Sequence, residues 1–288
     1  MGWLETAIRE VRGFAYAGAR KAAAPRRRPR VGLALGGGFA RGISHLGVLR
    51  ALQLKNIPID CIAGTSAGAL AGIAFASGRP FDEVVLKASA IRFGTFGQWR
   101  FSRMGFASNK PLEAYPEKYL GVSTFGDLKI PMSIAATDLL TGEPVFFTSG
   151  PLGQPLRGAC AYPGLFQPVE YEGRMLVDGF ISAAVPVDAA RLMGAEIVIA
   201  VFLEAESAER PKNIVDVIGR SFSITRLQAD VGWRLKSDIV ITPKVREFAW
   251  DDFARTSELV AAGEAAALEA IPQIEAALRP VVEQAQPS

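Results

Sequence analysis

The sequence predicts an α/β fold with a mostly parallel central sheet and helices on both of its faces. From residue 31 onward, short apolar runs typical of buried strands alternate with longer segments whose apolar residues recur at helical spacing. This alternation is typical of a parallel sheet covered by helices on both sides. Hydrophobic residues make up 49% of the 288 residues, enough for one sizeable core.

The pattern predicts the order of the elements. The expected strands are 31–35, 59–63, 131–137, 143–148, 196–202 and 238–241, with a short hairpin over 169–177. The expected helices are 43–54, 69–76, 81–92, 152–161, 187–193, 214–235 and 256–278. Residues 91–109 are expected to form a loop in which aromatic and basic side chains alternate, a composition that suits contact with lipid headgroups or packing back onto the core.

Charge divides the chain into an N-terminal arm, residues 1–30, and one domain, residues 31–288. The arm holds eight basic and two acidic side chains, whereas the domain holds 24 basic and 27 acidic ones. Apolar residues at helical spacing precede the basic stretch. This predicts either a helix packed on the domain and a solvated linker, or an interfacial helix that favours anionic lipid. The acidic domain argues against a nucleic-acid partner.

The cysteine content and the apolar runs indicate the compartment. Cys61 and Cys160 both lie in apolar or small-residue segments, so we expect buried free thiols rather than a disulfide. No apolar run reaches the length of roughly 18 residues that a membrane-spanning helix needs, and charges interrupt the N-terminus where a signal peptide would be apolar. We therefore expect a cytoplasmic protein, with peripheral contact at the inner face of the membrane as a candidate property.

The most informative motif is Gly64-Thr65-Ser66-Ala67-Gly68, which stands between an apolar strand and a small-residue helix. This is the G-x-S-x-G pattern in the strand–turn–helix context that makes its serine a nucleophile. The sharp bend exposes the Ser66 hydroxyl, and the following helix N-terminus favours negative charge. The alternative is an ordinary tight turn rich in glycine and serine.

A second glycine-rich loop, residues 36–42, also joins a strand to a helix. Its backbone N–H groups form a nest suited to a phosphate or an oxyanion. Its spacing fits neither a dinucleotide fingerprint nor a P-loop.

A serine nucleophile needs a base, and the sequence narrows the choice. His45 is the single histidine of the chain, and it precedes Ser66, which is not the order of an α/β-hydrolase triad. Asp178, at a strand end and followed by a glycine, is the first candidate. Asp138 is its rival, although its surroundings also fit an ordinary turn.

Taken together, these motifs resemble those of bacterial patatin-like phospholipases. The resemblance rests on the glycine-rich loop 36–42, the serine motif 64–68 and Asp178-Gly179, with Ala136-Thr137-Asp138 and Ala161-Tyr162-Pro163-Gly164 in support. It spans about residues 31–270. It implies a patatin-like three-layer sandwich and a lipid acyl hydrolase that needs neither metal nor cofactor.

The resemblance also implies roles for individual residues. Ser66 corresponds to the nucleophile and Asp178 to the base of a catalytic dyad. The backbone amides of Gly37, Gly38 and Phe39 in the glycine loop correspond to the oxyanion hole. Arg41 corresponds to a residue that shapes this loop.

Two positions depart from the family pattern. Phe39 stands where a further glycine is common, which is harmless if its φ is negative because only its N–H is needed. Phe180 follows Asp178-Gly179 where a smaller residue is usual, and we expect it to narrow the acyl pocket.

The expected substrate is a phospholipid, a lysophospholipid or a simpler carboxylic ester. Two other classes of function stay open from the residues alone. One is a phosphate- or nucleotide-binding module that uses the glycine loop. The other is a non-catalytic scaffold that its basic arm recruits to membranes.

Overall fold

The computed structural model describes residues 28–204, 210–211 and 214–279. The arm predicted over residues 1–30 therefore lies outside the described residues, apart from its last three. Residues Arg30–Ala277 form one compact unit that carries the sheet. Within the described residues, no helix combines the length and the apolar character needed to cross a bilayer.

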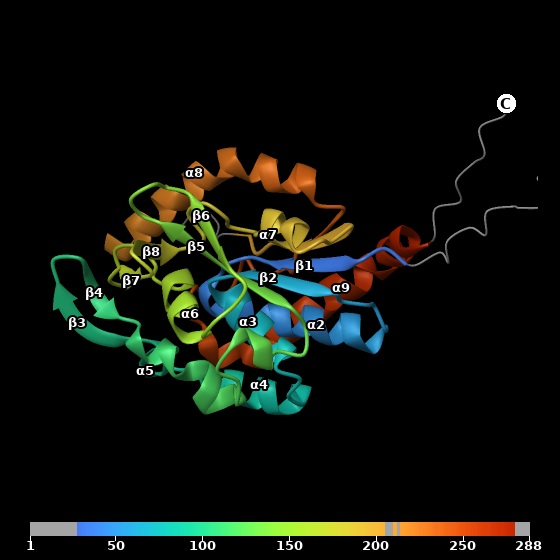
Figure 1. Ribbon diagram of the computed structural model, residues 1–288, viewed down its shortest axis with the longest axis horizontal. Coiled ribbons are helices and arrows are strands. Elements are labelled where there is room, and N and C mark those ends of the chain that lie inside the picture. The colour runs from blue at the N-terminus through green and yellow to red at the C-terminus, as the bar shows by residue number, and fades with distance from the viewer. Residues whose placement is uncertain (1–27, 205–209, 212–213, 280–288) are drawn as a thin grey trace, which may run out of the picture. The chain divides into compact units, whose positions relative to one another are not determined.

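Among the described residues, eight strands form one mixed sheet (Figure 1). Neighbouring parallel strands occupy most of it, in the spatial order β10 (Ile239–Ile241), β9 (Ile197–Val201), β1 (Val31–Leu35), β2 (Cys61–Thr65) and β5 (Met132–Asp138). The antiparallel strands are β6 (Pro144–Phe147), β8 (Arg174–Asp178) and β7 (Val169–Tyr171). The prediction of a mostly parallel central sheet is confirmed.

Helices cover both faces of this sheet (Figure 1). On one face lie α2 (Ser44–Leu54), α3 (Ala67–Ala76), α4 (Phe81–Ser89) and α9 (Thr256–Leu278). On the other lie α7 (Val187–Leu192) and α8 (Ile214–Lys236). Helix α6 (Gly153–Ala159) packs against β5 and β8. Short helical turns include η1 (Phe39–Ile43), η2 (Lys110–Glu113), η3 (Pro116–Leu120), η4 (Phe125–Asp127) and η5 (Phe253–Arg255).

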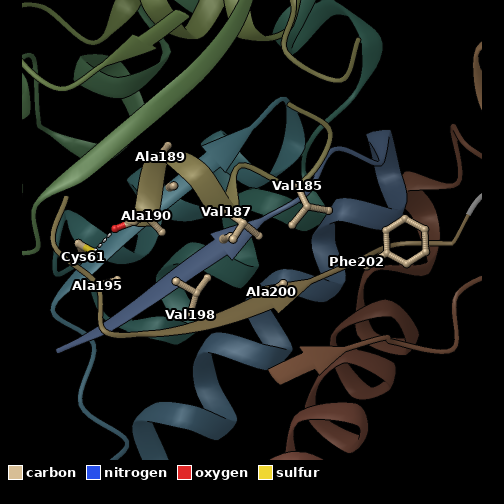
Figure 2. Close-up of a cluster of buried hydrophobic side chains, with 11 residues drawn as sticks. Cys61, Val185, Val187, Ala189, Ala190, Ala195, Val198, Ala200 and Phe202 are labelled. Atoms are coloured by element: carbon tan, nitrogen blue, oxygen red, sulfur yellow. Dashed lines mark hydrogen bonds between the residues drawn. The ribbon is translucent and has the colours of Figure 1, made fainter. Parts of the chain in front are cut away.

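Small and β-branched residues let α7 lie close to the sheet. Figure 2 shows this part of the core, which is built mainly from alanines and valines of α7, β9 and the neighbouring strands β1 and β2. A Cβ atom at Gly32 of β1 would lie only 2.6 Å from the Cβ atom of Ala195, so this position of the strand has no room for a side chain. Cys61 belongs to the same cluster, and burial raises the pKa of its thiol to about 11. Both cysteines are buried free thiols, as predicted.

The segment 91–109 differs from the expected loop. It contains a short helix, α5 (Phe93–Phe96), and an antiparallel hairpin of β3 (Gln98–Ser102) and β4 (Gly105–Ser108). The hairpin forms a separate two-stranded sheet that projects beyond α5 (Figure 1). The alternation of aromatic and polar residues over 98–102 is the strand signal, which the surrounding glycines obscured in the sequence.

Candidate active site

Ser66 stands alone on the bend between β2 and α3. Its backbone has φ 53° and ψ −122°, a sparsely populated conformation for a residue with a side chain. A Cβ atom at Gly64 would lie 2.6 Å from the Cα atom of Ala69, and one at Gly68 would lie 2.2 Å from the carbonyl oxygen of Leu35. The two glycines of the motif therefore provide space for close backbone approach, while Ser66 itself takes the strained torsion angles.

The sheet brings Asp178 to Ser66 through β5. Strand β2 pairs in parallel with the first half of β5 and ends at Thr65, opposite Ala135. Strand β8 pairs antiparallel with the second half and ends at Asp178, opposite Ala136. Strand β6 pairs with the opposite edge of β5, next to parts of both halves. Strands β2 and β8 must therefore both lie along the remaining edge of β5, where their carboxyl ends face each other.

This meeting joins two residues that lie 112 positions apart in the chain. The Ser66 hydroxyl Oγ donates a hydrogen bond of 2.8 Å to Oδ2 of Asp178. The other carboxylate oxygen, Oδ1, accepts the N–H of Phe180 at 2.9 Å. Asp178 is 1% exposed and Ser66 is 9% exposed. The glycine after Asp178 permits this approach as expected, because a Cβ atom at Gly179 would lie 2.3 Å from the carbonyl oxygen of Ala135.

The rival carboxylate, Asp138, is the last residue of β5 and begins a turn. Its Oδ1 accepts the N–H of Leu140 at 3.0 Å, and its Oδ2 lies 3.5 Å from Nη1 of Arg174. Its carbonyl oxygen accepts the N–H of Gly142, which has a positive φ of 78°. The interpretation of this aspartate as an ordinary turn residue fits these contacts.

His45 is buried and supports the glycine loop. Its Nε2 lies 2.8 Å from the carbonyl oxygen of Gly36, so this nitrogen carries the proton and donates. Burial lowers the pKa of the imidazole to about 4, which keeps it neutral near pH 7. The ring thus holds the beginning of the loop in place.

The glycine loop lies beside Ser66 but offers fewer amides than we expected. A Cβ atom at Gly37 would lie 3.4 Å from that of Ser66, so the loop lies close to the elbow, the bend formed by residues 64–68. However, the N–H of Gly37 donates to the carbonyl of Ala184 at 3.2 Å and is therefore engaged within the fold. The N–H groups of Gly38 and Phe39 have no acceptor among the residues that the structure describes.

Phe39 also differs from expectation in its backbone. Its φ is +49°, in the left-handed region, so the condition under which phenylalanine would be harmless here, a negative φ, is not met. The ring packs edge-on against Tyr162 and Trp250, with centroid distances of 5.1 and 5.3 Å. These contacts hold a strained residue where glycine would be relaxed. Nearby, Arg41 donates from Nη1 to the carbonyl of Glu204 at 3.4 Å, which links η1 to the segment after β9.

A cavity of about 100 Å³ opens beside the Ser66–Asp178 pair. Most of its lining is aliphatic or aromatic and comes from α2, α3, α4 and the turns after β4; it includes Phe39, Leu46, Leu70, Val84, Ile91, Leu112, Leu120 and Phe166. Phe180, expected to narrow the acyl pocket, instead packs on Tyr162 with centroids 6.0 Å apart and is not part of this lining. The cavity suits an unbranched apolar chain that ends at Ser66.

Cys160, expected from the sequence only as a buried free thiol, lies in the candidate site. It lines the cavity with Ser66 and Asp178. Burial and the nearby Asp178 charge raise the pKa of its thiol well above the ordinary value, so it stays protonated. Its place in a small-residue segment directly before Ala161-Tyr162-Pro163-Gly164 was the available signal.

Comparison with known proteins agrees with this architecture. The family model described as patatin-like phospholipase matches residues 33–191. An uncharacterized NTE family protein of Mycobacterium bovis is 38% identical over 184 residues, which is 62% of this chain and 51% of that protein. A protein of Aspergillus fumigatus named as a lysophospholipase is 31% identical over 202 residues, 67% of this chain and 13% of its own length.

The chain thus spans about half the length of its mycobacterial relatives and a small part of the fungal ones. Among solved structures, VipD from Legionella pneumophila has the same fold, with a TM-score of 0.57 at 15% identity over 88% of this chain and 68% of that one. The family match covers more than half of this chain and includes both the elbow and Asp178. The chain belongs to the patatin-like phospholipase family.

Proposed function

We propose that this protein is a lipid acyl hydrolase in which Ser66 is the nucleophile and Asp178 is the general base. The observation that carries the proposal is the 2.8 Å hydrogen bond from Ser66 Oγ to Asp178 Oδ2, at a strained elbow that opens onto an apolar cavity. The substrate class is a phospholipid, a lysophospholipid or a simpler carboxylic ester. The name of the Aspergillus fumigatus relative supports the lysophospholipid choice.

In the first half of the reaction, Ser66 Oγ attacks the ester carbonyl carbon while its proton passes to Oδ2 of Asp178. The carbonyl oxygen becomes an oxyanion, which the N–H groups of Gly38 and Phe39 receive. When the tetrahedral intermediate collapses, the bond to the alcohol oxygen breaks. The alcohol takes the proton from Asp178 and departs, and the acyl group stays bonded to Ser66 Oγ.

In the second half, water attacks the acyl-enzyme and Asp178 takes a proton from it. The second collapse releases the fatty acid and returns the proton to Ser66 Oγ. The N–H of Phe180 on Oδ1 keeps the carboxylate oriented with Oδ2 toward the serine throughout. The α3 N-terminus behind Ser66 adds a favourable field for the oxyanion.

The glycine loop needs support for this role. His45 holds the carbonyl of Gly36, and the Gly37 N–H is fixed by Ala184, so the next two amides are presented from an anchored backbone. Arg41 contributes by linking η1 to the carbonyl of Glu204. In this proposal Gly37 and Arg41 act as positioning residues, and the oxyanion hole consists of the Gly38 and Phe39 amides.

Labelling with a fluorophosphonate probe tests the proposal directly. Such a probe phosphonylates an activated serine, so mass spectrometry of digested wild-type protein is expected to find the adduct on Ser66. The Ser66→Ala protein is the matched control and is expected to stay unlabelled. Absence of labelling in wild type, or an adduct that forms equally in the variant, would contradict the serine mechanism and favour a binding module or scaffold.

A further inference from the structure

The β3–β4 hairpin presents large apolar side chains to solvent. Trp99 and Phe101 lie two residues apart and therefore on one side of β3, with their rings stacked at 6.5 Å and 18°. Phe106 of β4 meets Phe101 edge-on at 6.3 Å, and Met104 is exposed at the turn. An exposed apolar patch of this kind marks a contact surface.

A row of stacked rings connects this patch to the cavity beside Ser66. From Phe101 it continues through Trp99 to Phe93 at 4.7 Å and 22°, and from Phe93 to Phe166 at 6.2 Å and 8°. Phe101 is 79% exposed, whereas Phe166 is 2% exposed and lines the cavity. The row therefore runs from solvent to the wall of the candidate active site.

Backbone hydrogen bonds fix the hairpin to the segment that carries Phe166. The N–H groups of Phe106 and Ala107 both donate to the carbonyl of Leu165, at 3.1 and 2.9 Å. The N–H of Gln167 donates back to the carbonyl of Ala107 at 3.0 Å. Whatever binds the hairpin is thus held in a defined position relative to the cavity.

The charge of this region favours an anionic surface. Between Glu83 and Glu113 the sequence contains five basic residues and no acidic one. Two of the five, Arg100 and Arg103, are exposed on the hairpin itself, between and beside the exposed aromatic residues. Aromatic rings flanked by arginines are typical of segments that sit at the level of lipid headgroups, where anionic lipid attracts the basic groups.

We propose that the β3–β4 hairpin inserts into the surface of an anionic bilayer and that its row of aromatic rings aligns the cavity with the membrane. The inference rests on the proposed lipid hydrolase function, since it names the surface from which the substrate enters. In this arrangement Phe101 and Met104 enter the acyl boundary, and Arg100 and Arg103 contact headgroup phosphates. A lipid that leaves the bilayer then moves along the rings toward Ser66.

A fluorophore at the hairpin tip tests the insertion. The two native cysteines are buried, so the full chain with Met104→Cys offers an exposed thiol for an environment-sensitive nitrobenzoxadiazole label. With vesicles of equal parts phosphatidylcholine and phosphatidylglycerol, its emission is expected to rise severalfold and to shift to the blue. A label at Leu192→Cys on α7, where the native side chain is 77% exposed, is expected to stay unchanged.

Sedimentation with the same vesicles measures how much the hairpin contributes to binding. The parent is the Ser66→Ala protein, which leaves the lipid intact. Adding Phe101→Glu and Met104→Glu is expected to weaken its binding by about tenfold or more, because both side chains lose their apolar contact and gain charge. Adding Leu192→Glu instead is expected to leave binding unchanged, and thermal melts of all variants check that they fold.

The outcomes separate this inference from the proposed function. An unchanged emission at position 104 in the presence of vesicles would overturn it, and so would equal sedimentation of the hairpin variant and its parent. An equally large loss with Leu192→Glu would also overturn it, because the effect would then not be local. Vesicle binding needs no turnover, and fluorophosphonate labelling needs no vesicle, so either proposal can fail while the other stands.

Discussion

The elbow around Ser66 is built from small buried residues, whereas the β3–β4 hairpin displays large apolar residues to solvent. At the elbow, glycines at 64 and 68 leave no room for a side chain, and the single strained residue is the proposed nucleophile. On the hairpin, all five residues of β3 are exposed. The difference indicates that packing holds the elbow in one geometry, whereas the exposed side chains of the hairpin have little packing within the chain.

This comparison predicts different consequences for substitutions in the two regions. Changes at the elbow and its neighbours should alter chemistry or folding stability, and the hairpin changes described above should alter membrane binding. At the elbow and the glycine loop beside it, the largest expected effects are on the rate of hydrolysis and the smallest are on folding stability.

Ser66→Ala is expected to reduce the hydrolysis of a water-soluble p-nitrophenyl ester by on the order of 10³-fold or more, because the nucleophile is lost. Stopped or continuous absorbance assays at saturating ester measure this. Vesicle binding by the variant should persist, since Ser66 is not among the exposed hairpin residues that are proposed to contact the bilayer. A rate within a few fold of wild type would show that another group performs the hydrolysis.

Asp178→Asn is expected to lower the same rate by roughly 10²- to 10³-fold, because an amide does not accept the serine proton. The matched control is Asp138→Asn, which changes a buried carboxyl group of the neighbouring strand β5 whose contacts are those of a turn. That control should retain nearly the full rate. If the Asp138 variant were the inactive one, the assignment of the base would be wrong.

His45 predicts a pH dependence of folding stability. Its pKa is about 4 in the folded protein and about 6.5 when unfolded, so between these values the unfolded chain binds a proton that the folded chain does not. The free energy of unfolding therefore falls as the pH falls from 6.5 to 4, by about 3 kcal/mol from this group at pH 4.

Urea unfolding at pH 7 and pH 4 checks this, with His45→Gln as the comparison. Glutamine can still donate to the Gly36 carbonyl but does not titrate, so the variant should lose about 3 kcal/mol less than wild type between the two pH values. Equal acid sensitivity in the two proteins would mean that His45 is not the buried neutral group described here.

Most of the fold could be predicted because its signals are local. Strand β1 has the predicted bounds, and helices α4, α6, α7, α8 and α9 begin at or within one residue of their expected positions. Strand β2 begins two residues later than predicted, and the carboxylate of Asp60 just before it accepts the N–H of Val31 at 2.7 Å. Strand β3 is harder to predict, because Gly94, Gly97 and Gly105 surround its alternating aromatic and polar residues and every residue of the strand is exposed.

The candidate site was predictable in its residues but not in its geometry. The motifs identify Ser66 and Asp178, yet their contact depends on β2 and β8 meeting along β5, a register that no local pattern encodes. The engagement of the Gly37 amide depends likewise on Ala184, from a distant part of the chain. The roles of these residues in catalysis stay predictions, which the variants above test.

The smallest expected effect concerns the backbone strain at Phe39. Replacing Phe39 by alanine or by glycine removes the same ring contacts with Tyr162 and Trp250, so the difference between the two variants reports the backbone alone. Since φ is +49° here, Phe39→Gly should be more stable than Phe39→Ala by about 1 kcal/mol.

Leu86, exposed on helix α4, provides the opposite reference for this measurement. In an ordinary helix alanine is the better residue, so Leu86→Ala should be more stable than Leu86→Gly by about 1 kcal/mol. Urea titrations of the four variants measure both differences under one condition. If alanine were the more stable residue at position 39 as well, the loop would not hold the left-handed backbone that presents the Gly38 and Phe39 amides beside Ser66.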